Sequence, residues 1–392
     1  MNANALPVYL DNQASTPLDP RVLEAMMPYF TEQFGNPHSE SHVYGSNAMA
    51  AIEAARAEVA KLIGADPREI VFTSGATEAN NLAIKGAAHF ARAHPPAGGA
   101  REHIVTLETE HKCVLESCAA LEREGFAVTY LAVEPNGLVS LDKLADALTE
   151  RTLLVSVLAA HNEIGVIQPL AEIGALCRSR GILFHTDAAQ AVGKIPLDVE
   201  AMKIDLMSIS GHKIYGPKGI GAIYVRRRPR VRLMPLIDGG GQERGVRSGT
   251  LPTPLCVGFG RACAIARDEM AGEAERVRGL RDRLRQSLLR RVPGVQVNGD
   301  EAHRLPGNLN VSFPGLTAPD LIEACPTIAI STGSACTSAT VEPSYVLRAL
   351  GMPDDEANGS IRVGIGRFNT AGDVDFAVDA LAAAAARLNG AR

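Results

Sequence analysis

Two segments of this sequence end an apolar run in side chains that can do chemistry. ILFHTDAAQ puts Asp187 at the end of a strand pattern and Gln190 one helical turn later, and SISGHKIYG puts Ser210, His212 and Lys213 in a glycine-rich turn. A buried carboxylate needs a cationic partner, for which a protonated pyridine nitrogen would serve. A confined lysine beside a histidine can lose its proton, as imine formation requires. Taken singly, however, Asp187 could be a helix cap and Lys213 a solvated loop residue.

The segment TSGATEANN offers a place for an anion. Ala76 and Thr77 end the segment of small residues Thr73–Thr77, which lies between the strand pattern EIVF and the helical stretch EANNLAIKGAAHFA. Small residues let backbone N–H groups approach an anion at a helix N-terminus, where the helix dipole favours negative charge. A phosphate would fit there, although an ordinary N-cap explains the same residues equally well.

Two more strand patterns end in polar groups. His111 follows HIVTLET and Asn162 follows TLLVSVLA. His111 could stack on a ring or protonate a ligand, but structural histidines are equally common. Because ligands of open α/β sheets bind beyond the carboxyl ends of the strands, we expect the anion loop, the acid, the lysine and these groups to meet at one edge.

A cysteine and an arginine in the last quarter of the chain complete the set. Cys336 lies among small polar residues in STGSACTSAT, which predicts an accessible thiol that can travel to its target. Arg362, in the strand pattern SIRVGIGR, could clamp a substrate carboxylate through two hydrogen bonds, or form a surface ion pair.

The elements that must position these residues follow a regular order. From residue 70 to 225, short β-branched runs alternate with amphipathic helical stretches, which predicts an α/β fold with a large, doubly wound, mainly parallel sheet. A long helix is predicted from Arg261 to Arg291, and shorter strands and a final helix from Val374 to Leu388 indicate a smaller α+β domain. We therefore expect a large domain over 15–260 and a small one over 1–14 and 261–392, which carries the cysteine loop.

Composition excludes several classes of protein. The chain has 392 residues and a formal net charge of −5, which argues against nucleic-acid binding despite the basic run RRRPRVR. Seven cysteines without a C-x-x-C pair favour a reducing compartment, and the sequence has neither a leader pattern nor a long apolar run. We expect a cytoplasmic protein, with no membrane insertion and no metal site.

Together these motifs resemble the cysteine desulfurases of the IscS and NifS kind, within the class V aminotransferase-like enzymes that use pyridoxal 5'-phosphate (PLP). The resemblance runs almost end to end, and it implies the fold-type I architecture of PLP-dependent transferases. The segments that carry it include YLDNQASTPLDPRV, FGNPHSESH, FTSGATEANNLAIKG, TEHKCVL, NEIGVIQP, HTDAAQAVGK, SGHKIYGPKGIGA, GGGQERGVRSGT, GSACTSATVEPSYVLRALG and SIRVGIGRF.

The resemblance assigns a role to each matching residue at the cofactor ring. It implies that Lys213 holds PLP covalently, that Asp187 binds the pyridine nitrogen, and that Gln190 faces the ring hydroxyl. It also implies that His111 stacks on the ring and moves protons, and that Cys336 receives sulfur from L-cysteine as a persulfide while alanine leaves.

Further residues match the family's phosphate and substrate ligands. Ser210, His212, Ala76 and Thr77 resemble the phosphate site, and Thr250 resembles a ligand lent by the neighbouring subunit of a homodimer. For the substrate, the resemblance implies that Asn162 and Arg362, together with Asn36, contact the carboxylate.

Some features depart from the family or leave alternatives open. AST and TGSAC stand where ATT and SGSAC are common, and the short carboxyl end puts docking to an iron–sulfur scaffold protein in question. The sulfur acceptor could be such a scaffold or a tRNA-thiolation relay protein. A selenocysteine lyase would share nearly every residue named, and an inactive PLP-fold scaffold protein is a further alternative. A class V aminotransferase would not need Cys336, and GPKGIG has the wrong spacing for a dehydrogenase.

Overall fold

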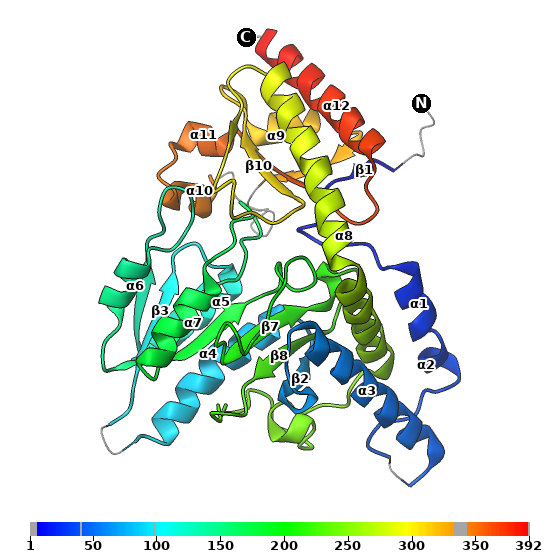
Figure 1. The fold of residues 1–392 in the computed structure, drawn as a ribbon, viewed down its shortest axis with the longest axis vertical. Helices are drawn as coiled ribbons and strands as arrows, with labels where there is room; N and C mark the ends of the chain where they lie inside the picture. The colour runs from blue at the N-terminus through cyan, green and yellow to red at the C-terminus, as the bar shows by residue number, and fades with distance from the viewer. Residues whose placement is uncertain (1–5, 40, 97–98, 333–342, 391–392) are drawn as a thin grey trace.

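The structure is a computed structural model, and it describes residues 6–39, 41–96, 99–332 and 343–390. A seven-stranded sheet lies at the centre of its larger part (Figure 1). The strands run parallel to their neighbours except β8, which is antiparallel to both β2 and β7. The predicted doubly wound, mainly parallel sheet is thus confirmed. In spatial order the strands are β2 (Ile70–Thr73), β8 (Gly221–Val225), β7 (Leu206–Ser210), β6 (Leu183–Asp187), β5 (Thr152–Ser156), β3 (His103–Leu107) and β4 (Ala127–Leu131).

Helices cover both faces of this sheet because successive side chains of a strand point to opposite sides. Ile70 and Phe72 of β2 join one apolar cluster, whereas Val71 between them joins the cluster on the other face. Burial on both faces explains why these strands are short, continuous apolar runs rather than alternating ones. The helices of the first face include α3 (Val43–Leu62), α6 (Leu141–Ala147) and α7 (Leu170–Ser179), and those of the second are α4 (Ala76–Ala93) and α5 (Lys112–Arg123).

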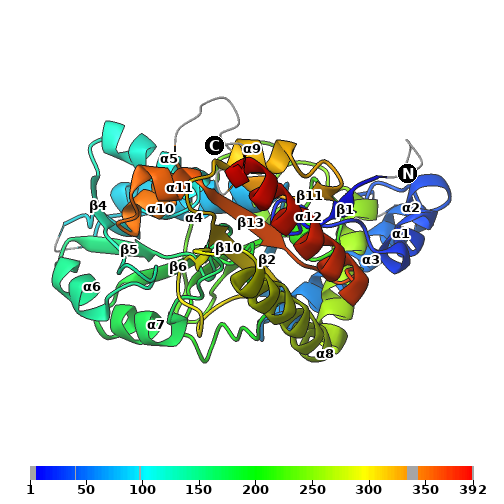
Figure 2. The same cartoon turned by 90° about the horizontal axis from the view of Figure 1, so that it is seen from above.

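A smaller four-stranded antiparallel sheet forms the upper part of Figure 1. Seen from above in Figure 2, α12 and α8 lie side by side next to this sheet. The segment TIAIST forms two short strands, of which β11 pairs with β1 and β12 pairs with β13. The four-stranded sheet consists of β9 (Gln296–Val297), β10 (Asn308–Ser312), β12 (Ser331–Thr332) and β13 (Ser360–Gly364), and β1 (Val8–Tyr9) and β11 (Ile328–Ala329) form a separate pair. The helices that follow α8 are α9 (Ala318–Glu323), α10 (Tyr345–Ala349), α11 (Asp354–Asn358) and α12 (Ala371–Gly390).

The long helix α8 (Thr253–Arg291) begins eight residues before the predicted start at Arg261. Gly258 and Gly260 lie in this early part, where Gly260 packs directly on Ala55 of α3. The first half of α8 belongs to the core of the large sheet and the second half to the core of the small one. The proposed boundary between residues 260 and 261 therefore falls inside a continuous helix, and the division into two domains stays a proposal.

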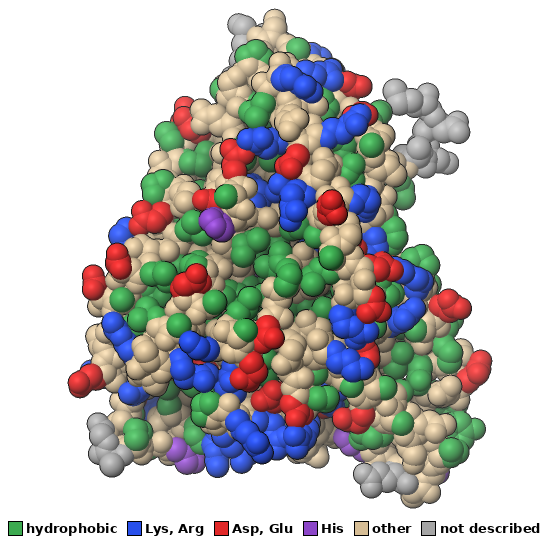
Figure 3. All heavy atoms as spheres, in the orientation of Figure 1, with side chains coloured by type: hydrophobic (Ala, Val, Ile, Leu, Met, Phe, Trp, Pro, Cys, Tyr) green, Lys and Arg blue, Asp and Glu red, His purple; other side chains and the backbone are tan. Residues whose placement is uncertain are grey.

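Two short helices, α1 (Pro20–Met26) and α2 (Pro28–Thr31), pack beside α8. On the face drawn in Figure 3, acidic and basic side chains are interspersed around an apolar central area. Among the residues that the structure describes, no helix combines the length and apolar character of a membrane span. The same residues contain no cluster of three or more His, Cys, Asp or Glu side chains that could hold a metal ion.

Candidate active site

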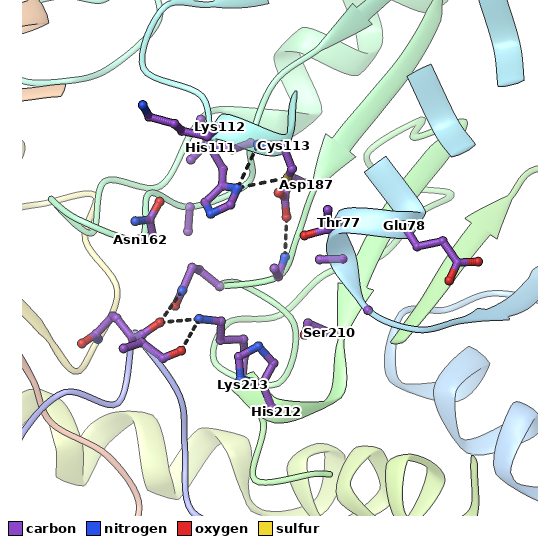
Figure 4. A pocket seen from close by; sticks show the side chains of 18 of the residues that line it. Thr77, Glu78, His111, Lys112, Cys113, Asn162, Asp187, Ser210, His212 and Lys213 are labelled. Carbon is purple, nitrogen blue, oxygen red and sulfur yellow. Dashed lines mark hydrogen bonds between the residues drawn. The ribbon is translucent and has the colours of Figure 1, made fainter. Parts of the chain in front are cut away.

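A cavity of about 590 Å³ opens at the carboxyl ends of β5, β6 and β7, on the edge where the sequence predicted a site. Figure 4 shows its labelled side chains arranged around a common space. Strands, helix N-termini and turns from distant parts of the chain contribute to its wall. Ten of the predicted site residues line it: Ala76, Thr77, His111, Asn162, Asp187, Gln190, Ser210, His212, Lys213 and Arg362.

Three predicted site residues do not line this cavity within the described chain. Asn36 is exposed in a loop, where its Oδ1 accepts a hydrogen bond from the backbone N–H of His38. Thr250 is exposed as well, and since it was expected to serve a neighbouring subunit, that expectation stays a prediction. Cys336 lies outside the described residues.

Lys213 ends a single 3₁₀ turn, Gly211–Lys213, that follows β7. Gly211 makes this turn possible because a Cβ there would lie 2.9 Å from Ile220 and 3.0 Å from the Pro217 carbonyl oxygen. The Lys213 amine donates hydrogen bonds to the carbonyl oxygens of Gln13 (2.6 Å) and Ala14 (2.7 Å). The N-terminal segment thus holds the amine at the cavity wall.

Asp187 is the last residue of β6 and is only 7% exposed. Its Oδ1 accepts from the backbone N–H of Ala189 at 2.9 Å, and its Oδ2 accepts from the side-chain amide of Asn80 at 2.7 Å. Two donors fix the carboxylate while each oxygen keeps a further lone pair. The alternative of a simple helix cap accounts for only one of these contacts.

The anion-binding end of the cavity is the first turn of α4. Its N-cap is Gly75, with φ of 151°, and no described side chain caps the helix. This turn packs closely on Gly221 of β8. A side chain at Gly221 would prevent that packing, because its Cβ would lie 2.7 Å from the Gly75 Cα. His212 lies nearby, and burial followed by the charge of Lys213 lowers its pKa to about 4. The histidine is therefore neutral at pH 7 and can donate or accept a hydrogen bond.

Arg362 reaches the cavity from β13 of the small sheet. Its Nη2 lies 2.7 Å from Oδ1 of Asp11, and its Nη1 donates to the carbonyl oxygen of Asn162 at 3.1 Å. With 2% of the Arg362 side chain and 17% of the Asp11 side chain exposed, the pair lies largely inside the protein, so the alternative of a surface ion pair is wrong. Its Nε has no partner among the described residues.

Two buried acids stand behind the polar wall. Burial raises the pKa of Glu110 well above its ordinary value, although the backbone N–H of Leu158 donates to its Oε1. Burial also raises the pKa of Glu163, which lines the cavity, to about 7, against the smaller effects of Ser344 and Arg362. Both acids therefore hold their protons more firmly than exposed glutamates do.

Several residues that contact the predicted site residues were not themselves predicted from the sequence. Lys194 donates to Oε1 of Gln190 at 3.0 Å, while Gln190 donates to the Gln13 carbonyl oxygen at 2.9 Å. The motif HTDAAQAVGK carried this signal, because Lys194 stands one helical turn after Gln190. Asn80 and Cys113 gave no comparable signal, since their contacts join separate helices.

A family model described as "Aminotransferase class-V" matches residues 8–376. The chain belongs to this family. Among curated proteins, it is 58% identical over 379 residues to the cysteine desulfurase IscS of Rickettsia felis, covering 97% of this chain and 91% of that protein. It is 59% identical over 373 residues to a cysteine desulfurase of Homo sapiens, with 95% and 80% covered. The resemblance to the IscS and NifS type is confirmed.

Solved structures of similar proteins share the fold. A NifS-like protein superposes with a TM-score of 0.89 at 38% identity, covering 96% of this chain and 99% of that one. The structure titled "SspA in complex with cysteine" gives a TM-score of 0.80 at 39% identity, with 93% and 100% covered. These matches confirm the predicted fold-type I architecture.

Class-V family enzymes use PLP, and the cavity fits that cofactor. PLP has a phosphate, an aldehyde and a basic ring nitrogen, and the cavity offers a different partner for each. The uncapped first turn of α4 suits the phosphate, the Lys213 amine suits the aldehyde, and the Asp187 carboxylate suits the protonated ring nitrogen. The first turn of α4, Lys213 and Asp187 all line the same cavity.

Proposed function

We propose that this chain is a PLP-dependent cysteine desulfurase, which converts L-cysteine to L-alanine and keeps the sulfur as a persulfide on Cys336. The observation that carries the proposal is the presence of both the Lys213 amine and the Asp187 carboxylate in one cavity. The nearly full-length similarity to cysteine desulfurases supports the choice of reaction.

The residues of the cavity divide into cofactor and substrate ligands. Asp187 and Gln190 would hold the ring of PLP, and Ala76, Thr77, Ser210 and His212 would hold its phosphate. When bound, PLP accepts the substrate amine at its aldehyde carbon and withdraws electrons from the substrate Cα. Arg362 would bind the substrate carboxylate, because its buried guanidinium can donate in a fork that matches a carboxylate. Asn162 lies beside it, and Asn36 is a further proposed contact.

Proton movement falls to two side chains. The Lys213 Nζ takes the proton from the substrate Cα, since the carbonyl oxygens of Gln13 and Ala14 already orient this amine at the cavity wall. His111 moves protons on the opposite side of the cavity, where Figure 4 shows its ring. The Cys336 thiolate attacks the substrate sulfur, and the Cβ–S bond breaks with its electron pair left on Cβ. A proton added at Cβ and a proton returned to Cα by Lys213 complete alanine.

The oligomeric state, the sulfur acceptor and the cellular compartment are further parts of the proposal. The chain forms a homodimer in which Thr250 completes the phosphate site of the partner subunit. The persulfide is then passed to an acceptor protein, either an iron–sulfur scaffold or a relay protein of tRNA thiolation. We also propose that the enzyme works in the cytoplasm.

The test is mass spectrometry of the purified holoenzyme after incubation with L-cysteine. We expect one added sulfur atom on the peptide that contains Cys336, and none in the Lys213→Ala or Cys336→Ser variant. Cys325→Ala is the matched thiol control, since Cys325 is buried in the small sheet's core, and it should keep the modification. Sulfur on another thiol, or modification without Lys213, would contradict the proposal. Equal or faster turnover of selenocysteine would instead favour a selenocysteine lyase.

A further inference from the structure

Cys113 is a thiol at the cavity, on the first turn of α5, and the sequence motifs assign it no role. Its Sγ lies 3.0 Å from Nδ1 of His111 and 3.1 Å from Nδ2 of Asn80. Its backbone N–H also donates to Nδ1 of His111, at 3.2 Å. The labelled residues of Figure 4 show His111, Cys113 and Asp187 gathered at the same side of the cavity.

The donors in this group can be assigned from the chemistry of Asn80. Asn80 is fully buried, and its Nδ2 contacts both Oδ2 of Asp187 (2.7 Å) and the Cys113 sulfur. The opposite orientation of the amide would place its carbonyl oxygen against the Asp187 carboxylate, which is repulsive. Because an amide nitrogen only donates, the sulfur of Cys113 accepts from it.

The donor in the contact between the Cys113 sulfur and Nδ1 of His111 follows from this assignment. With its sulfur accepting from Asn80, Cys113 keeps its S–H for Nδ1 of His111, which already accepts from the Cys113 backbone N–H. A ring nitrogen that accepts carries no proton in neutral histidine. The proton of neutral His111 therefore lies on Nε2, at the opposite edge of the ring.

We propose that Cys113 is a positioning residue for His111, whose thiol links the ring to the Asn80–Asp187 pair and keeps its proton on Nε2. The inference rests on the proposed function, in which His111 moves protons. Asn80 would thereby tie two groups together: the carboxylate that binds the ring nitrogen and the histidine on the other side of the cofactor. The thiol acts through His111 and needs no reaction of its own.

Charged groups from other elements also face His111 and set its background. Burial lowers the pKa of His161 to about 4 and raises the pKa of Glu110 well above its ordinary value. Replacing Cys113 changes a contact of His111 without removing either of these two groups. The other ionisable groups that line this cavity are Glu78 on α4, Lys112 on α5, Glu163 after β5, Asp187 on β6, His212, Lys213 and Lys218 after β7, Tyr345 on α10 and Arg362 on β13.

The sign of the expected effect follows from the donor. An S–H that donates to Nδ1 stabilises the neutral ring, so its removal should raise the pKa of His111. In Cys113→Ala we expect the acidic limb of the kcat profile to move up by about half a pH unit or more, and kcat at pH 7 to fall about five-fold, with KM changed less than about two-fold. Cys113→Ser should restore both, since a hydroxyl accepts and donates in the same way.

The experiment compares pH profiles of the holoenzyme forms and titrates His111 by NMR in histidine-labelled protein. Cys118→Ala is the matched control, because Cys118 lies on the same helix but is buried in the apolar cluster away from the cavity, and it should keep the profile of the unsubstituted enzyme. Nitrogen-15 shifts of the unsubstituted protein should show His111 protonated on Nε2, a result that does not depend on any variant folding.

Three outcomes would overturn the inference. They are a proton on Nδ1 of His111, an unchanged profile in Cys113→Ala, and a Cys113→Ser variant as impaired as Cys113→Ala. Absence of desulfurase turnover in the unsubstituted holoenzyme would count against the proposed function instead. The NMR measurement would still decide the position of the proton.

Discussion

Arg362 and Asp11 form a buried ion pair at the edge of the cavity, with Nη2 and Oδ1 2.7 Å apart. Oδ1 of Asp11 also accepts from the Ser331 hydroxyl at 3.1 Å. Ser331 belongs to β12 and lies five residues before Cys336 in the sequence. One carboxylate therefore joins the proposed substrate ligand to the strand that leads into the cysteine segment.

Replacing Arg362 by lysine tests the fork geometry of this group. Lysine keeps the charge but loses the paired N–H donors that fit a carboxylate, so we expect KM for L-cysteine to rise about ten-fold, or about 1.4 kcal/mol, with a smaller change in kcat. Arg283→Lys is the matched control, since Arg283 pairs with Asp375 on the surface of the smaller part. Steady-state kinetics measure both, and an unchanged KM in Arg362→Lys would remove Arg362 from the substrate site.

The buried carboxyl of Glu163 should make the free energy of unfolding depend on pH. Burial raises the pKa of this carboxyl to about 7 in the folded chain, from its ordinary value of 4.5, so the folded state binds more protons than the unfolded state between these pH values. Its contribution to stability is therefore present below pH 4.5 and is lost as pH rises toward 7, by about 3 kcal/mol in total.

Glu163→Gln should remove this loss. Relative to the unsubstituted chain, the variant should gain more stability at pH 8 than at pH 5, in thermal unfolding followed by circular dichroism. Glu172→Gln, on the exposed side of α7, should show no such difference. Equal gains for Glu163→Gln at the two pH values would show that the acid is charged in the fold.

Gly260 sets the distance between α3 and α8. A Cβ at this position would lie 2.5 Å from the Cα of Ala55, and both residues belong to helices that cannot move independently of the core. We expect Gly260→Ala to lower the free energy of unfolding by about 1–3 kcal/mol. On the same helix, Gly272 has open space around it, so Gly272→Ala should raise stability by up to about 1 kcal/mol. Denaturant titrations that gave both variants the same sign would refute this packing argument.

The proposed exchange of Thr250 between subunits can be tested by complementation. In a mixed dimer of Lys213→Ala and Thr250→Ala chains, one cavity would contain an intact Lys213 and receive an intact Thr250 from its partner. We expect this heterodimer to recover about half of the activity of the unsubstituted dimer, whereas each variant alone is impaired. If Thr250 served its own chain, both cavities would be defective and mixing would restore nothing.

Particular residues show how far the sequence could predict this site. Asp187, Ser210 and Lys213 were found because each comes at or just after a strand end, and parallel strands bring those ends to one edge. The start of α8 was placed eight residues late, since Gly258 and Gly260 lower helix propensity locally, although Gly260 is required for the contact with Ala55 of α3 and Gly258 for the contact with Met26 of α1. Tertiary packing outweighed the local preference.

The sequence by itself determined the order of strands and helices, the edge of the sheet that holds the cavity, and the residue types gathered there. These features depend on periodicity and on short motifs, which act over a few residues. Only the tertiary structure decided the contacts of Cys113 with Asn80 and of Arg362 with Asp11. Hydrogen bonds between segments up to 351 residues apart depend on how helices and sheets pack, and no local pattern encodes that geometry.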